Sequence, residues 1–87
     1  MSNNKKPVSK VTLYPISAAI WRNESVKGGE PLYNVTFERS YKDNEGNWKT
    51  SDTFNAGDLL LLAKVADRAH SEIYKLRANV RHHDADE

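Results

Sequence analysis

The chain has 87 residues, no cysteine and a formal net charge of +1. A chain of this length forms one domain with a thin margin of stability, since it buries only roughly 60% of the surface that its unfolded form exposes. The lack of cysteine excludes disulfides and thiolate metal sites. The near-neutral charge disfavours strong nonspecific binding to duplex DNA, which requires many cations at the phosphates.

The two ends of the chain differ in composition from its middle. Lys5, Lys6 and Lys10 make the N-terminal end basic, and the C-terminal end is acidic. We predict a flexible basic arm over residues 1–9, a single α+β domain over residues 10–78 and a flexible tail over residues 79–87. Since no apolar run is long enough for a membrane span or a secretory signal, we expect a cytoplasmic protein with no membrane partner.

Residues 11–23 alternate between apolar and other side chains, which predicts a strand region. Pro15 interrupts it, and we expect a bulge or bend there because proline lacks the N–H that a central strand needs. Beyond the proline, the alternation places Ile20 on one face and Trp21 on the other. Residues 24–31 contain two glycines and a proline, and they predict a hairpin loop.

Residues 32–42 carry the clearest strand pattern of the chain. Asp43 to Asn47 then predicts a tight turn, with Gly46 suited to a positive φ, and residues 48–54 predict a returning strand. Short connections of this kind favour an antiparallel meander. One face of the 32–42 strand is expected to carry Tyr33, Val35, Phe37, Arg39 and Tyr41.

The segment after Asn55 predicts one long amphipathic helix. Asn55 suits the N-cap, and Asp58 can accept hydrogen bonds from the first free N–H groups. About twenty helical residues span nearly 30 Å, which is more than a small meander needs as a cover and indicates a second subunit. The Leu59–Leu62 run is either an exposed docking surface or, as we expect, buried on two sides. The apolar stripe consists of Leu59, Leu62, Ala66, Ala69, Ile73 and Leu76, widened by Leu61 and Val65.

Residue types that support catalysis are sparse. His70 lies beside the apolar stripe of the predicted helix, where a boundary position explains it. His82, His83 and Asp84 could bind a metal, but they lie in the predicted tail without a second ligand pair. No nucleophile has a recognisable base partner, so we expect neither an enzyme nor a cofactor.

Aromatic and basic residues recur together through the predicted strands. The turn at Asp43–Asn47 would pair Tyr41 with Lys49 and Lys42 with Trp48. Rings beside cations on a curved sheet are typical of single-strand binders, in which bases stack on the rings. The alternative is that the rings form core and cross-strand packing. The rings are Trp21, Tyr33, Phe37, Tyr41, Trp48 and Phe54, and the cations are Arg22, Arg39, Lys42 and Lys49.

The stretch from Val35 to Lys49 combines a strand, an aromatic residue, a D-x-E-G turn and a lysine. Together with the Asp58-Leu59-Leu60 helix start, it resembles the positive-cofactor-four family of transcriptional coactivators and its small bacterial relatives. The resemblance implies a curved antiparallel sheet, a C-terminal helix, a homodimer and binding of single-stranded DNA. It places Tyr41 at the family's base-stacking tryptophan and Lys49 at a phosphate-contacting lysine. Glu38 departs from the family, which has a DNA-contacting arginine there.

These observations lead to two hypotheses. The first is a homodimer, joined through the C-terminal helix, that binds single-stranded DNA or RNA. The second is a protein-interaction or regulatory module of the same fold that binds no nucleic acid. For the first hypothesis the expected nucleic-acid-binding residues are Tyr41, Lys49, Lys42, Arg39, Arg22 and Trp48.

Overall fold

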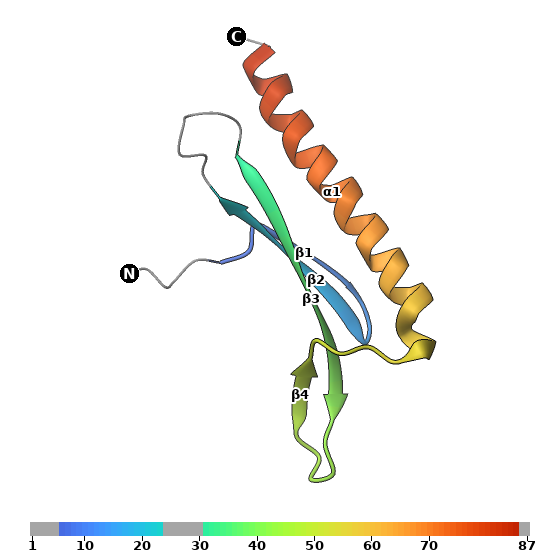
Figure 1. Ribbon diagram of the computed structural model, residues 1–87. Coiled ribbons are helices and arrows are strands. Elements are labelled where there is room, and N and C mark those ends of the chain that lie inside the picture. The colour runs from blue at the N-terminus through green and yellow to red at the C-terminus, as the bar shows by residue number, and fades with distance from the viewer. Residues whose placement is uncertain (1–5, 24–30, 86–87) are drawn as a thin grey trace.

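The computed structural model describes residues 6–23 and 31–85, with side chains as far as Ala78. The four strands form one antiparallel sheet in the order β1-β2-β3-β4, and a helix follows them (Figure 1). This arrangement confirms the predicted α+β class and the meander. The elements are β1 (Ser9–Leu13), β2 (Ile16–Asn23), β3 (Leu32–Lys42), β4 (Trp48–Ser51), the 3₁₀ turn η1 (Ala56–Asp58) and α1 (Leu59–Ala85).

The chain reverses at Pro15, where the sequence predicted only a bulge or bend. Leu13 lies opposite Ile16 in the register, so Tyr14 and Pro15 form a two-residue turn between β1 and β2. The peptide bond before Pro15 is cis. The Pro15 carbonyl accepts a hydrogen bond of 2.8 Å from the backbone N–H of Ser40. This bond fixes the turn against β3. The missing proline N–H is harmless because Pro15 lies in the turn, outside the paired residues of β1 and β2.

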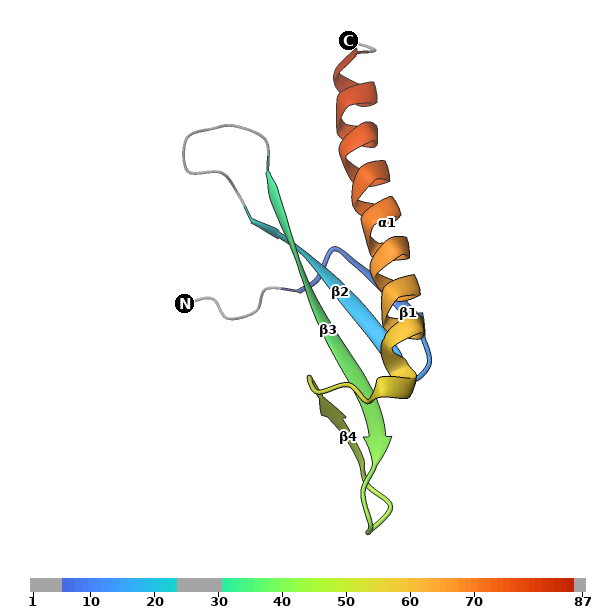
Figure 2. The ribbon, with the colours of Figure 1, turned by 45° about the vertical axis from the view of Figure 1, so that its right-hand side comes forward.

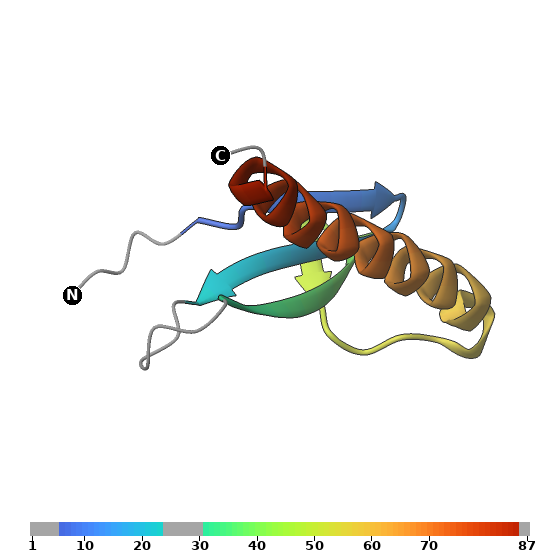
Figure 3. The ribbon, with the colours of Figure 1, turned by 90° about the horizontal axis from the view of Figure 1, so that it is seen from above.

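The core lies between the sheet and α1, which packs on β1 and β2 (Figure 3). Ile16, Ala18 and Ile20 of β2 are fully buried. The register sets Ala18 opposite Phe37 and Ile20 opposite Val35, as the predicted alternation requires. The helix-side face of the sheet therefore carries the apolar side chains, and the opposite face, here called the open face, lies away from α1.

The helix begins as the sequence predicted. The Asp58 carboxylate accepts a 2.9 Å hydrogen bond from the backbone N–H of Asn55, which satisfies a donor at the helix start. Val65 and Ala69 are buried in the core. Leu59 was predicted in the same stripe but is 54% exposed, because η1 precedes it and the helix face centred on Val65 and Ala69 meets the sheet.

The folded domain was predicted to end too early, at residue 78. α1 continues to Ala85, through residues predicted as a flexible tail. Residues 79–85 contain neither glycine nor proline, so nothing in them terminates a helix. At the other end, the backbone N–H of Val8 donates to the carbonyl of Ile20, so the predicted arm is partly built into the fold. Residues 1–5 of that arm and residues 24–30 of the predicted loop lie outside the described residues.

The β3–β4 hairpin projects beyond the start of α1 (Figures 1 and 2). Its turn forms as predicted: Gly46 has a φ of 85°, and the backbone N–H of Asp43 donates to the carbonyl of Asn47. β4 ends at Ser51 and is shorter than predicted. Beyond it, the Thr53 N–H donates to Oγ of Ser51 and the Thr53 carbonyl accepts from Arg39 Nε, so both groups bond to side chains instead of the ladder. The chain has a radius of gyration of 15.9 Å, whereas a compact domain of this length has about 12 Å.

Candidate nucleic-acid interface

The sheet divides the six predicted binding residues between its two faces. Trp48 pairs with Lys42, and Lys49 pairs with Tyr41, as the sequence predicted. Since successive residues of a strand point to opposite faces, Lys42 and Trp48 lie on the open face. The other four residues lie on the helix-side face. Arg39 is opposite the buried Ile16, Arg22 is opposite Tyr33, and Tyr41 and Lys49 form the next pair beyond Arg39 on that face.

Arg39 is engaged within its own chain. Its Nε donates to the carbonyl of Thr53 at 2.9 Å and lies 3.5 Å from Oδ2 of Asp58. The guanidinium carbon also lies 5.6 Å from the ring centroid of Tyr41. Arg39 thus joins β3, the segment before the helix and the helix start, and it braces Tyr41.

Lys49 is engaged as well. Its Nζ lies 3.6 Å from Oδ2 of Asp43, across the hairpin turn. Asp43 also accepts 2.9 Å hydrogen bonds from the backbone N–H groups of Glu45 and Asn47. The bond from Asn47 is the main reason that the pKa of Asp43 falls below its usual value, and those from Glu45 and Lys49 add to it. The lysine therefore lies over the turn on the helix-side face, with its side chain still 54% exposed.

The open face carries an exposed pair of rings beside the Asp43–Asn47 turn of the hairpin. Tyr14 and Trp48 meet edge to face, with centroids 6.1 Å apart and planes inclined at 78°. Tyr14 is 68% exposed and Trp48 is 58% exposed. Lys42 Nζ lies 5.3 Å from the centroid of the Trp48 ring. A depression of about 300 Å³ beside the pair includes Ser40 in its lining.

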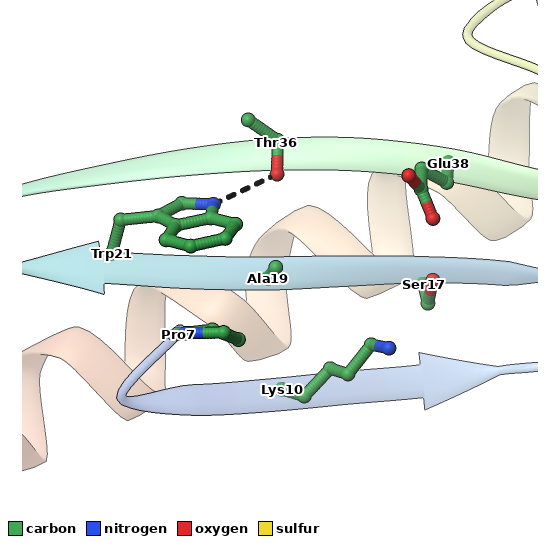
Figure 4. A pocket seen from close by; sticks show the side chains of 7 residues that line it. All are labelled: Pro7, Lys10, Ser17, Ala19, Trp21, Thr36 and Glu38. Carbon is green, nitrogen blue, oxygen red and sulfur yellow. Dashed lines mark hydrogen bonds between the residues drawn. The ribbon is translucent and has the colours of Figure 1, made fainter. Parts of the chain in front are cut away.

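A second group on the open face surrounds Trp21. The indole reaches from β2 towards β3, where its Nε1 donates a 2.9 Å hydrogen bond to Oγ1 of Thr36 (Figure 4). The small side chain of Ala19 leaves a depression beside the ring of about 210 Å³. We call it the Trp21 hollow, and it is lined by Pro7, Lys10, Ser17, Ala19, Trp21, Thr36 and Glu38.

Tyr14, Trp21 and Lys10 were not among the residues predicted for the site. The reversal at Pro15 brings Tyr14 to the end of β3, where it contacts Trp48. Because we expected only a bulge or bend at Pro15, this contact was not predicted from the sequence. For Trp21 the sequence did contain a signal, because the alternation in β2 places Trp21 and the buried Ile20 on different faces of the sheet. An aromatic side chain on the strand face away from the apolar Ile20 was the signal.

No family model, curated protein or solved structure matches the chain. No helix in the described part of the chain is long and apolar enough to cross a membrane. Among the described residues, no three His, Cys, Asp or Glu side chains gather where they could hold a metal ion. The side chains of His82, His83 and Asp84, the candidate ligands in the sequence, lie outside that part. His70 is exposed on α1.

Proposed function

We propose that the protein is a cytoplasmic single-strand binder, for DNA or RNA, that uses the open face of its sheet. The observation that carries the proposal is the exposed Tyr14–Trp48 pair with Lys42 beside it. Exposed rings offer stacking surfaces to unpaired bases of any sequence, and an adjacent ammonium group can meet the phosphates. Trp21 and Lys10 repeat the same combination farther along the face.

The proposed interface differs from the set predicted from the sequence. Lys42 and Trp48 are kept from that set. We propose that Arg39 and Lys49 act within the fold instead, since each is paired with a carboxylate of its own chain. The resemblance to the positive-cofactor-four family supports single-strand binding in general, and it remains a proposal that this chain is a relative.

We propose further that the protein is a homodimer joined through α1. Leu60 is 87% exposed at the start of the helix, and Leu59 beside it is more than half exposed. The elongated shape of the single chain supports this proposal, since a second copy could cover those side chains. Dimerisation would leave the open face accessible, because that face lies on the other side of the sheet.

The alternative is a protein-interaction module that binds no nucleic acid. One observation favours it: the Glu38 carboxylate lies on the open face, where it repels phosphates. The same exposed rings could then hold an extended segment of a partner protein.

A fluorescence-anisotropy titration with labelled oligothymidylate separates the two functions. We expect binding at low salt that weakens as salt is added, because phosphate contacts release counterions. Trp48→Ala should weaken it, and Tyr74→Ala is the matched control, since Tyr74 is a similarly exposed ring on α1. Absence of binding to single strands at low salt would favour the protein-interaction module.

A further inference from the structure

The Trp21 hollow brings a ring, a carboxylate and an ammonium group together on the open face. Trp21 lies at one end, Glu38 lies towards the other end and Lys10 lies along the β1 side (Figure 4). Its volume of about 210 Å³ is below the roughly 300–1,000 Å³ of sites for drug-sized ligands. The hollow therefore suits one planar group, such as a single base.

The two charged groups of the hollow are not used by the fold. Glu38 lies opposite Ser17 in the register, and β4 pairs with β3 only from Arg39 onwards. The side chains of Glu38 and Lys10 make no hydrogen bond and no ion pair within the described part of the chain. By contrast, Arg39 and Lys49 are both tied to carboxylates. A carboxylate and an ammonium group are thus left available to a ligand.

The chemistry of a carboxylate limits which base it can hold. An ionised carboxylate accepts hydrogen bonds through both oxygens and donates none. Guanine alone presents two adjacent donors on its Watson–Crick edge, at N1 and N2. Cytosine and adenine present one amino donor beside a ring-nitrogen acceptor, and thymine and uracil present one N–H between two carbonyl oxygens. Only guanine can occupy both oxygens of Glu38 without placing an acceptor against them.

We propose that the Trp21 hollow is a base-reading subsite that selects guanine within a bound single strand. Trp21 stacks on the base, Glu38 accepts from its N1 and N2 donors, and Lys10 contacts a neighbouring phosphate. A simple cation is disfavoured by Lys10, and a simple anion is disfavoured by Glu38. The inference rests on the proposed function, because the guanine belongs to a strand that the rest of the open face holds.

The test is a competition assay. Labelled oligothymidylate is displaced from the protein by unlabelled short oligothymidylates whose central nucleotide is thymine, guanine, adenine or cytosine. We expect the guanine-containing strand to bind roughly tenfold more tightly than the other three, in the range that one bidentate pair gives.

Glu38→Gln supplies the decisive variant, because a carboxamide offers one acceptor and one donor in place of two acceptors. It should abolish the preference for guanine while the oligothymidylate still binds. Glu45→Gln is the matched control: it removes the same charge from the exposed hairpin turn and should leave the preference unchanged.

The outcomes are distinguishable. If the four strands bind equally tightly, or if Glu38→Gln keeps the preference, the guanine subsite is wrong and single-strand binding by the open face stands. If no strand binds to the wild-type protein, the proposed function fails and the subsite fails with it.

Discussion

Tyr14 and Trp48 belong to different hairpins, yet their rings meet edge to face on the open side of the sheet. The contact depends on the hydrogen bond from the Ser40 N–H to the Pro15 carbonyl, which holds the first turn against β3. Rings in this geometry attract each other, but both stay more than half exposed. Burial in the core therefore does not account for this pair.

Removing either ring tests its role in binding. We expect Tyr14→Ala and Trp48→Ala each to weaken oligothymidylate binding by about 1–3 kcal/mol, because each removes a stacking surface. Anisotropy titration measures the effect, and the exposed Tyr74 again provides the control variant. A large loss of stability with unchanged binding by the folded fraction would instead assign the pair to packing.

The two lysines of the hairpin should differ in their effect on salt dependence. Lys42 lies beside an exposed ring, whereas Lys49 is paired with Asp43. Lys42→Ala should reduce the slope of log K against log salt by about 0.7, the value for one phosphate contact on a single strand. Lys49→Ala should leave the slope unchanged. The reverse result would support the assignment that the family resemblance implies.

Much of the fold could be predicted from the sequence because its signals are local. The alternation in residues 32–42 predicted the strand. The turn with Gly46 then predicted its register with the next strand, including the pairs Tyr41–Lys49 and Lys42–Trp48. The reversal at Pro15 could not be predicted in this way, because it depends on a hydrogen bond to Ser40 in a distant strand.

The candidate site was harder to predict than the fold. Tyr41 and Lys49 alternate with Lys42 and Trp48, so the two pairs point to opposite faces of one hairpin. The sequence predicted which strand residues pair, but not which carboxylates form ion pairs with Arg39 and Lys49. Asp58 lies beyond the end of the sheet, and its ion pair with Arg39 forms only once the chain after β4 returns to the Arg39 side chain.

Arg39 should prove to be a structural residue. Arg39→Ala removes a hydrogen bond and an ion pair from a side chain that is only 18% exposed. We expect the free energy of unfolding to fall by about 1–3 kcal/mol. Chemical denaturation measures this loss. We expect the folded variant to keep its affinity for single strands, which anisotropy titration measures. Arg39→Lys is the companion variant, since it retains the charge. A loss of affinity without a loss of stability would restore Arg39 to the binding site.

The hairpin turn should respond to acid through Asp43. Its pKa is lowered in the folded chain, chiefly by the hydrogen bond from the Asn47 N–H. The carboxylate therefore stabilises the turn above its unfolded pKa of about 4, and this contribution is lost as the pH falls through the lower, folded pKa. NMR titration of the Glu45 and Asn47 amide signals should show a transition below about pH 4. Asp43→Asn should remove it, and a transition near neutral pH would contradict the assignment.

The last prediction concerns assembly through α1. Leu60 is the most exposed of the large apolar side chains described, and it lies at the start of the helix, away from the core. We expect light scattering to give a mass near twice 9.9 kDa at micromolar concentration. Leu60→Asp should shift the protein to the monomer, because a carboxylate at an apolar contact loses its hydration without a partner. Trp48→Asp is the control, since it introduces the same charge on the open face. It should weaken strand binding and leave the dimer intact. A wild-type protein that is monomeric at that concentration, or dissociation by Trp48→Asp alone, would show that α1 does not form the interface.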